Sequence, residues 1–127
     1  MLHKEITDKI LKAFFNVYNQ LGYGFLEKVY ERSMVIELND LGLKCEAQKK
    51  IDVFYKNINV GDYYADLIVN EKVIVELKAA EGIINEHKAQ LLNYLKGTNI
   101  EVGLLLNFGS KPQFKRMIFE NKFKNPF

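Results

Sequence analysis

Two carboxylates and a lysine interrupt two short apolar runs near the middle of the chain. Asp66 lies within the run Tyr63–Val69, and Glu76 and Lys78 lie within the run Val73–Lys78. Burying such charges without compensation is costly, because each loses its hydration on leaving water. A cation would compensate the carboxylates, and oxygen ligands favour Mg²⁺ or Mn²⁺, which activate water and neutralise charge on a phosphodiester. The three residues therefore form a candidate site for metal-dependent hydrolysis.

The spacing between the two runs sets a geometric condition on this site. The runs are separated by three residues and are expected to pair as an antiparallel hairpin. If Val69 pairs with Val73 across a three-residue loop, Asp66 lies opposite Glu76 and shares its face of the sheet. A two-residue turn would place Asp66 opposite Val75 instead. The site hypothesis therefore predicts the odd-length loop, or a bulge.

An ordinary solvated strand face is the simpler explanation of these charges. Glu76 and Lys78 taken alone favour it, because Glu and Lys two residues apart are common on exposed strands. Asp66 favours the site, since Asp is disfavoured inside strands and needs a reason to be there. The residues by themselves leave both interpretations open.

Composition places these residues in a globular protein of ordinary size. The 127 residues are 48% hydrophobic, enough for the core of one domain spanning residues 1–127. The lone Cys45 excludes an intramolecular disulfide and a Cys-based zinc site, which suits a reducing cytoplasm. Charged residues interrupt the apolar N-terminal segment, so we expect no signal peptide and no membrane span. The formal net charge of +2 is too small to indicate nucleic-acid binding by itself.

Two helices are expected before the strands. Apolar residues at three- and four-residue spacing predict an amphipathic helix over about residues 3–21. A second helix is predicted from Phe25 to a stop at residues 39–42. Gly22 ends the first helix and Gly24 allows the chain to turn, so the two helices form a hairpin.

The rest of the chain predicts a mixed sheet with one further helix. Extended runs at residues 47–55 and 58–60 flank a turn at Lys56-Asn57 and precede the runs that carry the carboxylates. A third helix lies between Gly82 and Gly97. The unbroken apolar run Val102–Phe108 is typical of a strand covered on both faces and follows a crossover long enough for parallel pairing.

The tail from Pro112 mixes basic and aromatic residues. This composition predicts a short helix or an edge strand followed by a frayed end. Exposed aromatic residues there would make a homodimer unsurprising. The order of helices and strands describes one α/β domain.

The segment Gly22–Tyr30, with the sequence GYGFLEKVY, resembles the signature of the GxxExxY proteins. Gly24, Glu27 and Tyr30 stand at the named positions. The similarity then covers nearly the whole chain, through Tyr64–Leu67, Val75–Ala79, His87–Leu95 and Gly103–Gly109. That family is placed in the PD-(D/E)XK nuclease-like superfamily. The resemblance implies a restriction-endonuclease-like α/β core, in which a mixed four-stranded sheet is flanked by helices.

The resemblance also implies a set of metal ligands. Asp66 and Glu76 would hold Mg²⁺, or Mn²⁺, with help from the Leu77 carbonyl, and Glu27 would reach in from the second helix. A simpler role for Glu27 is to favour a helix N-terminus, where negative charge meets the helix macrodipole. Its place in the signature favours the site.

Other roles follow from the same resemblance. Lys78 would orient water and stabilise developing negative charge. Gln90 resembles the helix residue that supports the site in the superfamily. Tyr30, His87 and Tyr94 are expected at the substrate. His87 is left out of the metal set because imidazole is not a preferred Mg²⁺ ligand.

Together these observations predict a Mg²⁺-dependent nuclease that hydrolyses phosphodiester bonds of nucleic acid, with DNA favoured over RNA. Fold-level kinship does not establish activity. A non-catalytic module that binds nucleic acid or protein is therefore the main alternative, and hydrolysis of a small phosphate ester is a third.

Overall fold

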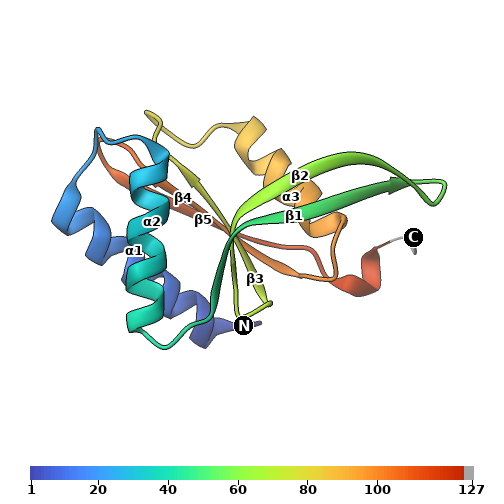
Figure 1. Ribbon diagram of the computed structural model, residues 1–127, viewed down its shortest axis with the longest axis horizontal. Helices are drawn as coiled ribbons and strands as arrows, with labels where there is room; N and C mark the ends of the chain where they lie inside the picture. Colours follow the sequence, from blue (N-terminus) through green and yellow to red (C-terminus); the bar gives the residue numbers. More distant parts are fainter. Residues whose placement is uncertain (125–127) are drawn as a thin grey trace.

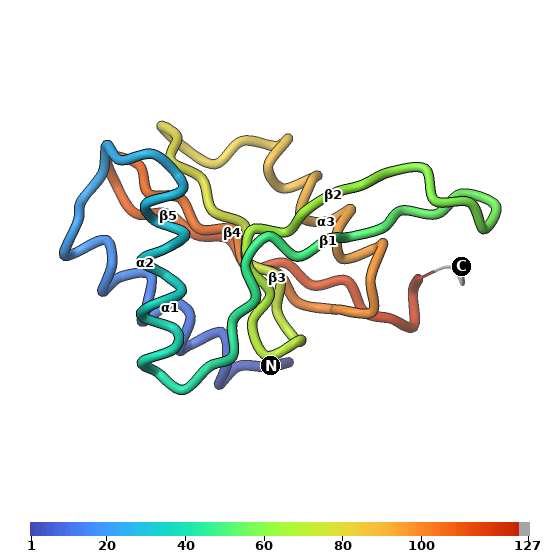
Figure 2. Tube along the Cα trace, viewed as in Figure 1, coloured from blue at the N-terminus to red at the C-terminus, as the bar shows by residue number. Residues whose placement is uncertain are grey.

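The computed structural model describes residues 1–124 of the chain, and Figures 1 and 2 show its path. The expected frayed end of the tail falls on residues 125–127 and lies outside the described residues. The elements, in order, are α1 (Lys4–Leu21), α2 (Glu27–Asp40), β1 (Cys45–Tyr55), β2 (Ile58–Val69), β3 (Val73–Lys78), α3 (Asn85–Lys96), β4 (Val102–Phe108), β5 (Pro112–Ile118) and the 3₁₀ turn η1 (Asn121–Phe123).

The five strands form one mixed sheet in the order β1-β2-β3-β4-β5. Only the β3–β4 pair is parallel, and it is joined through α3, as the length of the crossover predicts. The sheet has one strand more than the four expected, because the segment Pro112–Ile118 pairs with β4 as an antiparallel edge strand. Of the two predictions for the start of the tail, the edge strand is confirmed.

Helices cover both faces of the sheet. Side chains of α1 and α2 pack on one face against Val73, Val75 and Leu77 of β3. Leu91 and Leu95 of α3 pack on the other face. All seven residues of β4 are buried, which explains why its sequence is apolar without alternation. The predicted flanked sheet and N-terminal helical hairpin are both present (Figure 1).

The β2–β3 connection has the register that the site hypothesis requires. Val69 pairs with Val73 across the three-residue loop, in which Asn70 and Glu71 adopt left-handed φ values of 51° and 56°. A Lys72 N–H to Val69 carbonyl hydrogen bond of 3.0 Å closes the turn. The odd-length loop is therefore confirmed.

Strands β1 and β2 continue beyond the rest of the sheet as a two-stranded ribbon (Figures 1 and 2). Its tip is the predicted turn at Lys56 and Asn57, whose φ values of 50° and 64° suit a two-residue hairpin. β2 is continuous from Ile58, which joins two runs that the sequence separates. No helix within residues 1–124 combines the length and the apolar character that crossing a membrane requires.

The segment that follows β3 is fixed by the fully buried Asn107 of β4. The Asn107 side chain accepts a hydrogen bond from the Ala80 N–H and donates one to the Ala80 carbonyl, both at 3.0 Å. Gly109 packs so closely here that an added Cβ would overlap the Ala80 carbonyl oxygen. This contact holds the strand end that carries Lys78.

Gly109→Ala is expected to destabilise the protein, because relief of the overlap requires movement of the Ala80 backbone. The free energy of unfolding, measured by urea denaturation, should fall by about 1–3 kcal/mol, the usual cost of overpacking. Gly82→Ala is the matched control, since a Cβ there meets only the Gln113 side chain at 3.6 Å. Equal effects of the two substitutions would contradict this account of the packing.

Candidate active site

Asp66 and Glu76 lie where β2 and β3 separate. The backbone ladder between these strands ends at Leu67 and Val75. At the next position side chains replace it: the Asp66 N–H donates to Glu76 Oε1 at 3.0 Å, and the Leu77 N–H donates to Asp66 Oδ2 at 2.8 Å. Each carboxylate is thus held by the backbone of the strand opposite.

Burial of this pair changes its acid–base behaviour. Glu76 is only 3% exposed, and loss of hydration together with the negative charge of Asp66 raises its pKa to about 8. Loss of hydration also raises the pKa of Asp66, although the Leu77 N–H and the charge of Lys78 oppose the shift. The buried Glu76, beside the partly buried Asp66, therefore retains a proton at neutral pH.

A pocket of about 140 Å³ opens beside Asp66. It is lined by Glu27, Lys28, Glu31, Gln48, Asp66 and Leu77. Glu27 is the first residue of α2, and its Oε2 accepts a hydrogen bond from the Ala79 N–H at 3.4 Å. The structure therefore brings Glu27 to the same pocket as Asp66, and its position at a helix N-terminus is also favourable.

Glu31, Gln48 and Lys28 also line this pocket and were not identified as site residues from the sequence. Glu31 is buried and accepts hydrogen bonds from the side chains of Gln48 and Lys28. Gln48 also reaches Asp66 Oδ1 at 3.5 Å, and it has a left-handed φ of 53° within β1. Glu31 lies four residues after Glu27, a helical spacing that could have revealed it. No pattern in the sequence predicts the left-handed backbone conformation of Gln48.

A hydrogen-bonded chain connects the site to α3. Lys78 Nζ donates to Gln90 Oε1 at 3.4 Å, and Gln90 Nε2 donates to the Tyr94 hydroxyl at 3.0 Å. Burial and the charge of Glu76 raise the pKa of Tyr94 to about 12, so its hydroxyl stays protonated. Gln90 thus lies where it can orient the Lys78 ammonium group.

The structure places Tyr30 in the core, away from the expected substrate contact. Its side chain is fully buried and stacks on Phe108 with ring centroids 4.1 Å apart. Its hydroxyl donates to the Gly22 carbonyl and accepts from the Phe25 N–H. Tyr30 therefore holds the turn before α2, in which Gly24 has a φ of 108°, and acts on the site only through that turn.

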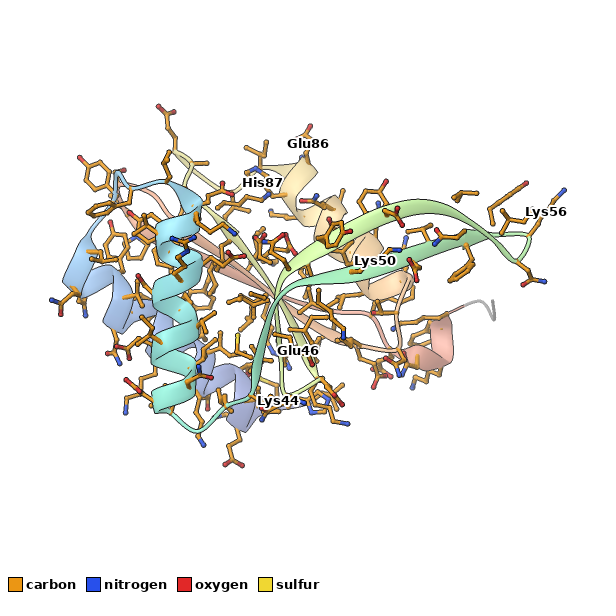
Figure 3. The ribbon with its side chains drawn as sticks, in the orientation of Figure 1. Lys44, Glu46, Lys50, Lys56, Glu86 and His87 are labelled. Atoms are coloured by element: carbon orange, nitrogen blue, oxygen red, sulfur yellow. The ribbon has the colours of Figure 1, made fainter. Side chains whose placement is uncertain are left out.

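His87 lies at the N-terminal end of α3 (Figure 3). Its Nδ1 accepts a hydrogen bond from the Ile84 N–H at 3.3 Å, so the ring helps to begin the helix. It is partly exposed and is not hydrogen-bonded to the carboxylates.

The arrangement of the acidic side chains decides whether the site fits a metal ion. Within residues 1–124 no three histidine, cysteine or acidic side chains form a group that could hold one, so the expected trio of Glu27, Asp66 and Glu76 is not assembled as direct ligands. Asp66 and Glu76 remain as an adjacent pair beside the Leu77 backbone. Mg²⁺ is usually bound by one or two carboxylates, with water and substrate phosphate completing its shell. The pair therefore fits Mg²⁺.

Comparison with known proteins agrees with this fold. A family model of the PD-(D/E)XK nuclease superfamily matches residues 4–117. The chain belongs to this superfamily. The fold of this superfamily member is similar to the crystal structure of SSO0001, with a TM-score of 0.54 and 18% identity over 73% of this chain. The chain spans about half of that protein, as the match covers 50% of its length, and a search of curated proteins finds no significant match.

The raised pKa of Glu76 predicts a pH dependence of stability in this nuclease-superfamily protein. The folded-state pKa of about 8 lies above the ordinary value of 4.5, so the folded protein binds this proton more tightly. With metal removed by chelation, the free energy of unfolding contributed by Glu76 should therefore be lost as pH rises from 4.5 to about 8. Glu76→Gln should flatten this fall, as measured by urea unfolding.

The exposed Glu71 provides a control for that experiment. Glu71→Gln should leave the pH profile unchanged. Parallel profiles for the wild type and Glu76→Gln would show that Glu76 does not carry the retained proton.

Proposed function

We propose that the protein is a Mg²⁺-dependent nuclease that hydrolyses phosphodiester bonds of nucleic acid, with DNA favoured over RNA and Mn²⁺ as an alternative ion. Within its superfamily it is best placed among the GxxExxY proteins. The observation that carries the proposal is the adjacent pair of the buried Glu76 and the partly buried Asp66, which favours a bound proton or cation, with Lys78 two residues after Glu76 on β3.

Each residue has a role that its position supports. The Asp66 and Glu76 carboxylates and the Leu77 carbonyl would hold the ion, which when bound activates water and neutralises phosphate charge. Lys78, oriented by Gln90, would place its ammonium group against the negative charge that develops on phosphate oxygen. Glu27 supplies an exposed carboxylate on the same pocket, suited to hydrogen-bond water there.

A non-catalytic binding module is the second candidate. It is favoured by the hydrogen bonds that already engage Asp66, Glu76 and Glu27, because carboxylates held by backbone N–H groups can be structural. The exposed Phe114 and Phe123 also leave a homodimer as a proposal for either function. A cleavage assay distinguishes the nuclease from the binding module directly.

Asp66→Ala and Lys78→Ala should each lower Mg²⁺-dependent cleavage by at least about 100-fold, the scale on which loss of transition-state charge stabilisation acts. The measurement uses labelled single- and double-stranded DNA and RNA with identically purified proteins. Asp40→Ala and Lys72→Ala, at exposed positions, are matched controls that should cut normally. Absence of cleavage on every substrate, or cleavage unchanged in the site variants, would favour the binding module.

Metal binding gives a test that does not depend on turnover. Mg²⁺ at about 100 times its Kd should stabilise the wild type by about 2.7 kcal/mol, and the rise in Tm should disappear in Asp66→Asn and Glu76→Gln. The rise should be larger at pH 8 than at pH 6, since a proton on Glu76 competes with the ion. Asp62→Asn, at an exposed position, is the control. A Tm shift that survives both site substitutions would place the ion elsewhere.

A further inference from the structure

A groove of about 590 Å³ lies next to the candidate site, between the β1–β2 ribbon and α3. This groove is also lined by Gln90, which accepts a hydrogen bond from Lys78, and by Tyr94, which accepts one from Gln90. Tyr63 of β2 forms the facing wall, and Asn93 extends the α3 side. A strand of nucleic acid with its phosphate at Lys78 would therefore place a neighbouring nucleotide in the groove.

The Tyr63 ring is held in one position while part of it stays open. It is 47% exposed, and its ring centroid lies 5.7 Å from that of the buried Tyr94, with the ring planes inclined by 53°. A Cβ at Gly61 would lie 3.1 Å from the Tyr63 ring, so the glycine lets this ring lie close to the backbone. An aromatic ring fixed in this way can stack on a planar ligand with little loss of entropy.

The groove is lined by one acidic and one basic side chain, Glu86 and Lys96, so its charge does not favour binding by phosphate attraction alone. On the ribbon, Lys49 pairs with Glu46 at 3.0 Å, and Lys50 pairs with Asp52 and Asp62 at 3.5 and 3.3 Å. Figure 3 shows Lys56 at the tip of the ribbon. Because phosphate contacts by basic residues supply most non-specific affinity for duplexes, the pairing of Lys49 and Lys50 with acids reduces what these two lysines can contribute to it.

Stacking provides the affinity that charge does not. Every nucleobase has a π-face, and its edge carries the donors and acceptors that an amide recognises. The exposed Asn93 amide can bond to such an edge, whereas Gln90 is already engaged with Lys78 and Tyr94.

We propose that this groove binds a nucleobase of the substrate strand stacked on Tyr63, and that the substrate is accordingly single-stranded or locally unpaired nucleic acid. The inference rests on the proposed nuclease function and specifies its substrate class. A base inside a duplex is already stacked and paired, and extruding it costs a few kcal/mol. DNA and RNA strands share this chemistry and are separate arms of the test.

The test measures binding of fluorescently labelled oligothymidylate, oligouridylate and a DNA duplex of equal length, with Ca²⁺ replacing Mg²⁺ to keep the strands intact. Wild type should bind at least one single strand more tightly than the duplex. Tyr63→Ala should weaken single-strand binding by about 5- to 150-fold, equivalent to about 1–3 kcal/mol for one stacked base. Tyr63→Phe retains the ring and should bind nearly as wild type does.

Tyr64→Ala is the matched control. Tyr64 follows Tyr63 in β2 and is similarly exposed, but it does not line the groove. Wild-type affinity in Tyr63→Ala, an equal loss in Tyr64→Ala, or no binding of any single strand would overturn the stacking proposal. The relative affinities of the two single strands identify DNA or RNA as the ligand.

Failure of the stacking proposal is distinguishable from failure of the nuclease proposal. Cleavage that depends on Asp66 while Tyr63→Ala binds and cuts as wild type does would overturn stacking alone. Single-strand binding that depends on Tyr63, without any cleavage, would support stacking and overturn catalysis.

Discussion

The structure depends on the way in which β2 and β3 separate at two adjacent carboxylates, the partly buried Asp66 and the buried Glu76. Where the β2–β3 ladder stops, Asp66 and Glu76 take over the backbone hydrogen bonds that the next residues of a regular sheet would make. Because unpaired buried N–H groups are costly, these side chains allow the strands to diverge without leaving donors unsatisfied. The same hydrogen bonds bring the two carboxyl groups together beside a pocket. The contacts that shape the sheet at this point therefore also form the candidate site.

This arrangement makes stability and function compete. Burial and the charge of Asp66 raise the pKa of Glu76, and burial raises the pKa of Asp66, so ionising both carboxyl groups is unfavourable. The left-handed Gln48 on the neighbouring strand is a second local strain, located beside Asp66. Such conformations persist only where surrounding contacts hold them, and here the Gln48 side chain is hydrogen-bonded to Glu31 and Asp66.

Aromatic packing connects β4 of the sheet to the helical hairpin of α1 and α2. Tyr30 stacks on Phe108, and Phe14 packs edge-on against the same ring at 4.9 Å. Tyr30 also clamps the turn before α2, which sets where Glu27 begins the helix. The glycine and the tyrosine of the signature are therefore structural, and they place its glutamate at the pocket from a distance.

The sequence by itself determined the order of elements up to β4 and the positions of the two hairpin turns, and it reduced the register of Asp66 against Glu76 to a choice between two loop lengths. These depend on periodicity and loop length, which are local properties. Only the tertiary structure decided that Tyr30 is buried, that Glu31 and Gln48 join the pocket, that Glu27 stays outside a direct ligand group and that a fifth strand pairs with β4. Each of these depends on which distant segments pack together, and a local pattern carries no information about that packing.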